Sequence, residues 1–147
     1  MKFDKLMINT AIEISKFSTC KRLQVGAIIS RDNRIIATGF NGVAEGLEHC
    51  NKIFKKVNPK APDFSSIHHD FSTKNELHAE QNAIGFCAKS GIKTKGCIIY
   101  ITHSPCIHCA KLIIASGIKT VVYNKLYDRD QNFKVLFDKL NIKYREA

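Results

Sequence analysis

Two short segments decide the fold and the chemistry expected of this chain: HAE at residues 78–80 and PCIHC at residues 105–109. One histidine and two cysteines can supply three of the four tetrahedral ligands that zinc prefers, and a catalytic site leaves the fourth position for water. Cys106 and Cys109 are three residues apart, so on a helix they share one face. We therefore predict that His78, Cys106 and Cys109 bind a catalytic zinc ion.

Glu80 is the predicted proton carrier of this site. Residues two apart point away from each other on a regular helix, so His78 must lie at or before the first helical turn to share a metal with Glu80. The run STKN at residues 72–75 offers N-cap residues for such a helix. Bound zinc lowers the pKa of water to about 7. Glu80 would take the water proton and pass it to a ring nitrogen and a leaving amine.

The combination of H-x-E with P-C-x-x-C is the signature of zinc-dependent nucleobase deaminases. A purely structural zinc site is the alternative interpretation, since a C-x-x-C pair alone fits structural or redox roles. Glu80 would have no task in a structural site. The pattern therefore favours catalysis.

Composition indicates one domain, residues 1–147, with a formal charge of +10 and six cysteines. The chain has no apolar run long enough for a membrane helix and no signal-peptide pattern, so we expect a cytoplasmic protein. In that compartment the cysteines favour metal binding or core packing over disulfides. The charge suits an anionic partner, either a nucleotide or a nucleic acid, or reflects only solubility and scattered surface lysines. Charge alone does not choose between the two partners, and nucleic acid is the less favoured of them.

The apolar pattern predicts alternating helices and strands, which is typical of an α/β layered sheet. An amphipathic helix is expected at 3–18, with Phe3, Leu6, Met7, Ile14 and Phe17 on its apolar face. Strands are expected at 23–30, 35–40, 97–102, 120–123 and 142–144, the first two forming a hairpin. Further helices are expected from 80 to about 90, over 106–116 and around 135–140.

Residues 43–72 are predicted to be irregular, because they contain glycine, two prolines and few periodic apolar residues. An unstructured loop of this length is unusual inside a compact domain, so something should hold it in place. The loop carries His49, Cys50, His68 and His69, and Cys20 lies upstream. A second zinc is one hypothesis, and ordinary surface histidines with buried cysteines are the alternative.

Beyond these patterns, the sequence resembles the deoxycytidylate (dCMP) deaminases of the cytidine deaminase superfamily, especially their bacteriophage and viral members. The resemblance covers nearly the whole chain. It is carried by VGA at 25–27, TGFNG at 38–42, KNELHAEQNAI at 74–84, YITHSPC at 100–106, CAK at 109–111 and YD at 127–128. The sequence departs from the family at Phe40, where many members have tyrosine, and at Ala44, where proline is common.

The resemblance implies α/β/α layers around a five-stranded mixed sheet. It also implies that Glu80 is the proton shuttle beside the catalytic zinc. A second, structural zinc would be bound by Cys20, Cys50, His68 and Glu76, with His49 or His69 as alternatives to Glu76. The substrate contacts would come from Asn41, Ala79, Ser104 and Tyr127.

The activity implied by the resemblance is zinc-dependent hydrolysis of dCMP to dUMP, which supplies dTMP synthesis. Such an enzyme would be a homohexamer in the cytoplasm, or in the host cytoplasm if viral, with dCTP as activator and dTTP as inhibitor. Three other functions stay open at this point: a tRNA adenosine deaminase, a cytidine or deoxycytidine nucleoside deaminase, and a non-catalytic metal-stabilised domain. No particular lysine or arginine is identified as the phosphate ligand.

Overall fold

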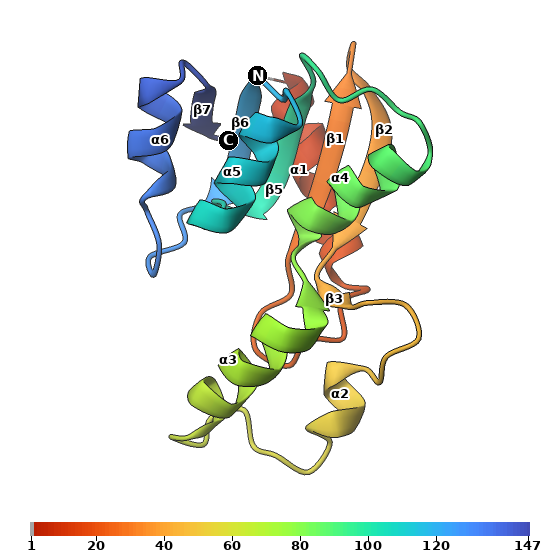
Figure 1. Ribbon diagram of the computed structural model, residues 1–147, viewed down its shortest axis with the longest axis vertical. Helices are drawn as coiled ribbons and strands as arrows, with labels where there is room; N and C mark the ends of the chain where they lie inside the picture. Colours follow the sequence, from red (N-terminus) through yellow and green to blue (C-terminus); the bar gives the residue numbers. More distant parts are fainter. Residues whose placement is uncertain (1) are drawn as a thin grey trace.

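A five-stranded sheet is the centre of the computed structural model, which describes residues 2–147 (Figure 1). Its strand order is β2-β1-β5-β6-β7. β1 pairs antiparallel with both β2 and β5, whereas β5, β6 and β7 run parallel. The strand bounds are β1 Gly26–Arg31, β2 Arg34–Phe40, β5 Ile98–His103, β6 Thr120–Lys125 and β7 Lys143–Glu146. The expected five-stranded mixed sheet is confirmed.

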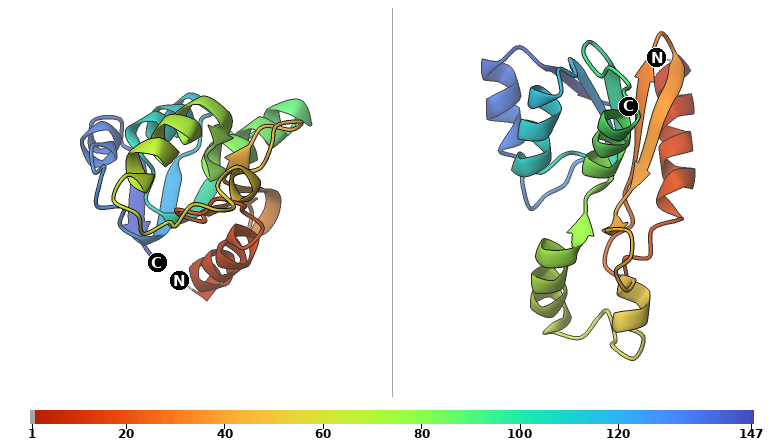
Figure 2. Two further views of the ribbon diagram at one scale, coloured as in Figure 1. Left: turned by 90° about the horizontal axis from the view of Figure 1, so that it is seen from below. Right: turned by 45° about the vertical axis from the view of Figure 1, so that its right-hand side comes forward.

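Helices cover both faces of this sheet and complete three layers (Figure 2). Helix α1 lies on one face, and helices α4, α5 and α6 lie on the other. The helix bounds are α1 Lys2–Ser15, α4 Ala79–Lys89, α5 Ile107–Ala115 and α6 Phe133–Lys139. Among the described residues no helix is both long enough and apolar enough to cross a membrane.

Two glycines allow helices to approach the sheet unusually closely. A Cβ atom added at Gly26 would lie 2.0 Å from the carbonyl oxygen of Ala11 on α1. A Cβ atom added at Gly39 would lie 2.3 Å from the carbonyl oxygen of Ala79 on α4. Because real Cβ atoms do not come this close to backbone, any larger residue would push the helix away. Gly39 therefore sets the position of the helix that begins at Ala79.

The buried face of α1 differs from the predicted one. It consists of Asp4, Met7, Ile8, Ala11 and Ser15. The predicted apolar face is wrong at Phe3, Leu6 and Phe17, which are 46%, 55% and 68% exposed. The physical reason is that Asp4 has partners inside the protein, so the helix turns a carboxylate inward in place of an apolar side chain.

Asp4 joins the two ends of the chain. Its carboxylate accepts three hydrogen bonds of 2.9–3.1 Å from Arg145 on β7, and a fourth of 3.2 Å from the Tyr100 hydroxyl on β5. Burial raises the pKa of the Asp4 carboxyl, but the hydrogen bonds and charge of Arg145 outweigh it, so the net pKa lies below the usual 3.8. The ionised carboxylate thus fastens α1 and β7 to the centre of the sheet.

Asp4→Asn is expected to lower the free energy of unfolding by about 2 kcal/mol at pH 7, because it removes charge-assisted hydrogen bonds inside the protein. A lowered pKa means that this contribution is complete above the unfolded pKa of about 3.9 and is lost as pH falls through the lower folded value. Urea unfolding at pH 7 and at pH 3 measures the difference between variant and parent. A difference of the same size at both pH values would contradict the ion-pair explanation.

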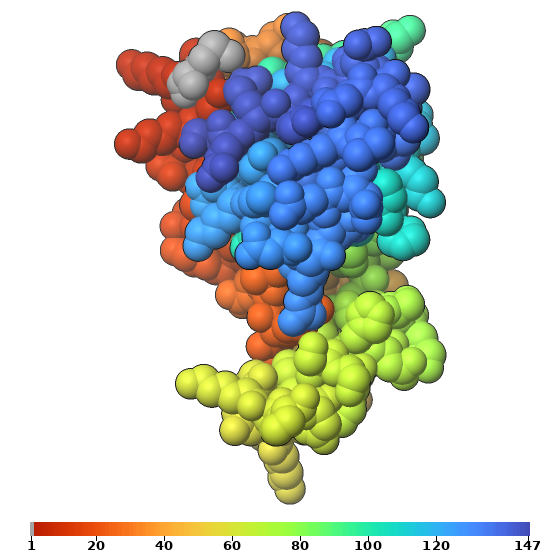
Figure 3. Space-filling view, turned by 90° about the vertical axis from the view of Figure 1, so that its left-hand side faces the viewer, coloured from red at the N-terminus to blue at the C-terminus, as the bar shows by residue number. Residues whose placement is uncertain are grey.

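Residues 44–75 form a lobe that projects from one end of the sheet (Figures 1 and 3). The prediction of an irregular loop at 43–72 is wrong here, because the lobe contains α2 (Cys50–Ile53) and the 12-residue α3 (Phe64–Asn75). A two-stranded ribbon of β3 (Gly42–Val43) and β4 (Glu76–Leu77) closes its base. The lobe therefore leaves and re-enters the main body at one point.

Candidate functional site

His78, Cys106 and Cys109 come together where two helices begin. His78 is the N-cap of α4 and Cys106 is the N-cap of α5. The expectation that His78 lies before the first helical turn is confirmed. Residues 72–75 do not cap this helix as expected, because they form the last turn of α3. Both positive helix ends point toward this group of three residues, which we call the catalytic cluster.

The spacing within the catalytic cluster fits zinc. The Nδ1 atom of His78 lies 3.6 Å from the Cys106 sulfur and 3.4 Å from the Cys109 sulfur. Zinc bonds of the usual lengths at tetrahedral angles would separate a nitrogen and a sulfur ligand by roughly 3.6 Å. All three ligand atoms lie within 4.8 Å of one another. The residues present can therefore bind a tetrahedral ion without rearranging.

Electrostatics in the catalytic cluster favour a thiolate beside the histidine. The hydrogen bond from the Cys109 thiol, with help from His78, lowers the pKa of Cys106 to about 4 against the effect of burial. The same bond, together with burial, raises the pKa of the Cys109 thiol. The hydrogen bond with Cys106 raises the pKa of His78. The Cys106 thiolate is thus stabilised at the position where a cation would bind.

Glu80 lies in the first turn of α4, next to the catalytic cluster, with only 4% of its surface exposed. Burial raises the pKa of its carboxyl, and the positive charge of His78 offsets part of this effect. A raised pKa brings a carboxyl group closer to neutral pH, where it can both accept and return a proton. The environment of Glu80 thus suits proton transfer.

Two further residues fix the catalytic cluster in place. Gln81 accepts a 2.7 Å hydrogen bond from the backbone N–H of His78. Asp130, from the connection between β6 and α6, accepts a 2.7 Å bond from the N–H of Ile107, the first residue of α5. Burial raises the pKa of Asp130, but this bond and those from Asn132 outweigh it and leave a lowered pKa. Sequence analysis missed Asp130, since nothing local links it to the cysteines.

A cavity of about 100 Å³ opens beside the catalytic cluster. All four residues predicted to contact substrate line it: Asn41, Ala79, Ser104 and Tyr127. The Asn41 amide donates to the Leu23 carbonyl and accepts from the Val25 N–H, each at 2.8 Å, so it also shapes the wall.

Two hydrogen bonds connect residues of the cavity wall. Ser104 accepts a 2.8 Å bond from the backbone N–H of Tyr127. Arg22 donates a 3.2 Å bond to the Tyr127 hydroxyl. Among the described residues that line the cavity, Arg22 is the only lysine or arginine.

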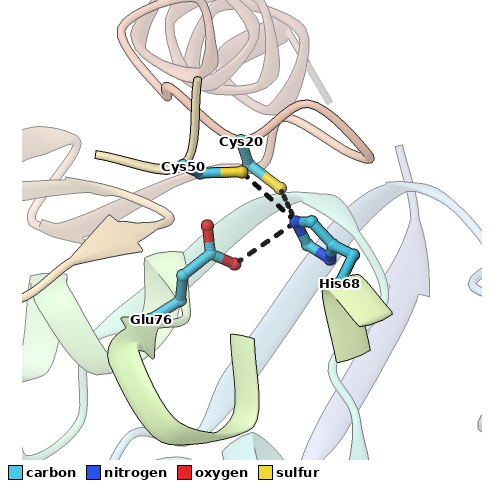
Figure 4. Close-up of side chains that lie close together, drawn as sticks. All are labelled: Cys20, Cys50, His68 and Glu76. Carbon is cyan, nitrogen blue, oxygen red and sulfur yellow. Dashed lines mark hydrogen bonds and ion pairs between the residues drawn. The ribbon is translucent and has the colours of Figure 1, made fainter. Parts of the chain in front are cut away.

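A second group, Cys20, Cys50, His68 and Glu76, also has its ligand atoms within 4.8 Å of one another (Figure 4). We call it the loop cluster. The Nε2 atom of His68 lies 3.3 Å from the Cys20 sulfur, 3.4 Å from the Cys50 sulfur and 4.0 Å from Glu76 Oε2. His49 and His69, the alternatives for the fourth ligand, are exposed and lie outside this group.

The loop cluster has the composition of a buried cation site. Burial raises the pKa of the Cys20 thiol and raises that of Cys50 to about 11, whereas it lowers the pKa of His68. Glu76 Oε1 and His68 Nδ1 are buried without a hydrogen-bond partner. Polar groups buried together in this way are costly unless something compensates them, and a metal ion would do so. The residues therefore fit a second metal.

Comparison with known proteins agrees with this geometry. Residues 1–125 match the family model described as the cytidine and deoxycytidylate deaminase zinc-binding region. The chain belongs to this family. It is 42% identical over 125 residues to ComE operon protein 2 of Bacillus subtilis, a match that covers 85% of this chain and 60% of that protein. It is 36% identical over 152 residues to the deoxycytidylate deaminase of Enterobacteria phage T4, covering 85% of this chain and 79% of the phage enzyme.

A solved structure of the family matches the whole architecture. The dCMP deaminase of cyanophage S-TIM5, in complex with dCMP and dUMP, superposes with a TM-score of 0.81 at 31% identity. The match covers 99% of this chain and 97% of the cyanophage chain. The chain thus shares the α/β/α fold of this cyanophage enzyme, and the family model that it matches is that of a zinc-binding region.

Proposed function

We propose that the protein is a zinc-dependent dCMP deaminase, which hydrolyses the amino group of dCMP to give dUMP and ammonia. The observation that carries this proposal is the composition of one cavity. Its wall contains His78 and Cys106 of the catalytic cluster, Glu80 and Arg22. Further support comes from phage relatives named deoxycytidylate deaminase and from a related structure in complex with dCMP and dUMP.

In the proposed mechanism Glu80 moves two protons. Zinc, when bound by His78, Cys106 and Cys109, supplies a water molecule whose pKa is lowered to about 7. Glu80 takes a proton from this water and delivers it to N3 of the pyrimidine ring as oxygen adds to C4. Glu80 then takes the proton of the hydroxyl now on C4 and gives it to the exocyclic amine, so that the C4–N bond breaks, ammonia leaves and the C4 carbonyl of dUMP forms. Glu80 is 4% exposed, so its carboxyl is largely shielded from bulk water, which suits transfer between the water and the substrate.

The remaining cavity residues are proposed to hold the nucleotide. The backbone of Ala79, completely buried at the start of α4, suits hydrogen bonding to the base. Asn41, Ser104 and Tyr127 form the wall on which the sugar would rest. Arg22 would bind the 5′-phosphate, because its planar guanidinium pairs with phosphate and is the only Lys or Arg among the described cavity residues.

The test is ammonia release from four substrates with zinc present: dCMP, deoxycytidine, CMP and a tRNA anticodon stem-loop. We expect dCMP to be turned over with the highest kcat/KM. Faster turnover of deoxycytidine would assign the protein to the nucleoside deaminases. Turnover of the RNA alone would assign it to the tRNA adenosine deaminases, and the net charge of +10 would then serve RNA binding.

The family resemblance supports three further proposals about the enzyme. We propose that it assembles as a homohexamer, that dCTP activates it and dTTP inhibits it, and that it acts in the cytoplasm, where its nucleotide substrate is found. Residues 1–147 would act as a single catalytic domain, with the loop cluster holding a second, structural zinc. Sedimentation with and without each nucleotide tests the assembly and its effectors.

A further inference from the structure

The loop cluster is connected to the active site through two very short stretches of backbone. Cys20, one member of the cluster, lies two residues before Arg22. Glu76, another member, lies two residues before His78 of the catalytic cluster. Cys20, His68 and Glu76 also line the same cavity as Glu80. The wall that faces the proposed substrate is thus made partly by residues of the loop cluster.

The segment that carries Arg22 is fastened to the lobe by several contacts. The backbone N–H of Lys21 donates to the Cys50 sulfur at 3.4 Å. The Lys21 ammonium donates to the carbonyl oxygens of Phe54 at 2.8 Å and Val57 at 3.0 Å. These bonds surround the residue that precedes Arg22, so the position of Arg22 depends on the lobe being in place.

The segment that carries His78 depends on the lobe in a similar way. Glu76 pairs with Val43, and the neighbouring pair Gly42–Leu77 follows directly after Asn41. The side chain of Glu76 is 2% exposed, and its Oε1 atom has no hydrogen-bond partner. A ligand ion is therefore the group that would fix this carboxylate, and with it the two-residue strand that leads to His78.

We propose that Cys20 and Glu76 are positioning residues, which hold Arg22 and His78 in the arrangement that nucleotide binding requires when the loop cluster binds a metal ion. This inference rests on the proposed deaminase function. It means that the loop cluster sets the affinity for a phosphorylated substrate in addition to stabilising the lobe. Loss of its metal weakens binding of the phosphate more than it slows the chemical step.

Cys50 provides the sharpest test, because it belongs to the loop cluster but does not line the cavity. Cys50→Ala is expected to remove one zinc per chain, measured by elemental analysis. It should raise the KM for dCMP about tenfold, because that is roughly the effect of losing one charge-assisted hydrogen bond to the substrate. The change in kcat should be smaller. The Kd of dCMP, measured by calorimetry in a Glu80→Gln background, should rise by the same factor. Deoxycytidine has no phosphate, so its KM should rise less.

His69→Ala is the matched control, since His69 is next to His68 on α3 but is exposed and outside the cluster. It should keep its zinc content and its KM. If Cys50→Ala does not fold, Glu76→Gln replaces it, because glutamine keeps the shape but binds metal more weakly. For Glu76→Gln the KM for dCMP should fall as free zinc is raised, whereas that of the parent stays constant.

The outcomes separate this inference from the proposed function. A parent protein that does not turn over dCMP would overturn the function itself. A parent that turns over dCMP, with variants that lose the loop-site zinc but keep the parental KM and Kd, would overturn only the inference. A Cys50→Ala protein whose KM values for dCMP and deoxycytidine rise equally would also overturn it, because the effect would not act through the phosphate.

Discussion

Glu80→Gln is expected to lower kcat for dCMP deamination by about 10²–10⁴-fold, the usual contribution of a positioned proton-transfer group. Glutamine has nearly the same shape as glutamate, so it should fit the buried site without disturbing α4. It cannot accept a proton from water and return it to the base. The zinc content and the Kd of dCMP should therefore change little while kcat falls. Steady-state ammonia release, calorimetry and elemental analysis measure the three quantities.

Glu13→Gln is the control for this experiment. Glu13 lies on α1, where its exposed side chain pairs with Lys16. The same chemical change there should leave kcat and KM at their parental values. If Glu80→Gln kept more than a tenth of the parental kcat, another group would have to carry the proton, and the mechanism proposed for this site would be wrong.

Cys109→Ala should reduce activity about as much as Glu80→Gln does, but through loss of zinc from the catalytic cluster. Cys109 is completely buried and supplies one of the three ligand atoms in the catalytic cluster. Without it the remaining histidine and cysteine bind zinc too weakly to keep the site filled. We expect the loss of one zinc per chain and a decrease of about 10³-fold or more in kcat/KM, because water would no longer be activated.

Cys97→Ala provides the comparison for the ligand variant. Cys97 is also buried, with 1% exposed, but it packs in the core and belongs to neither metal cluster. Its replacement should cost some stability and leave the zinc content and kcat unchanged. Equal zinc loss in both variants would show that general destabilisation, and not the loss of a ligand, empties the site.

The sequence predicted those features that depend on local patterns. The strands are rich in β-branched residues, such as Ile28, Ile29 and Val121, and the structure buries all three. The H-x-E and P-C-x-x-C segments also carry their own geometric requirement, namely that His78 precede the first turn of its helix. Since these signals lie within a few residues of one another, no knowledge of the tertiary structure was needed to detect them.

Helix α3 was missed because its sequence is a poor helix former. Residues 64–75, FSSIHHDFSTKN, are rich in serine, histidine, threonine, aspartate and asparagine, which have low intrinsic helix propensity. The helix is stabilised instead by packing of Phe64, His68 and Phe71 with Phe54 of the lobe. The i, i+4, i+7 spacing of these three aromatic residues was the signal that could have identified it.

The contacts that Arg22 and Asp130 make near the cavity could not be predicted for a different reason. Arg22 bonds to Tyr127, 105 residues away, and Asp130 caps a helix that begins 23 residues earlier. Both contacts exist only because the sheet brings distant loops to one edge. Many exposed lysines, arginines and aspartates in this chain look the same in sequence, so only tertiary structure distinguishes these two.

The lobe has consequences for how the molecule unfolds. Its small core consists of Cys50, Phe54 and Phe64, together with Cys20 from the segment before β1. This core is separate from the two larger clusters that pack on the sheet. A segment with few apolar contacts of its own can open while the rest stays native, with a free energy well below that of global unfolding. The protein should therefore exchange the amide hydrogens of α2 and α3 as one cooperative group, ahead of those in β1, β5 and β6. If the loop cluster binds the proposed second metal ion, removing that ion should speed the exchange of this group and leave that of β1, β5 and β6 unchanged.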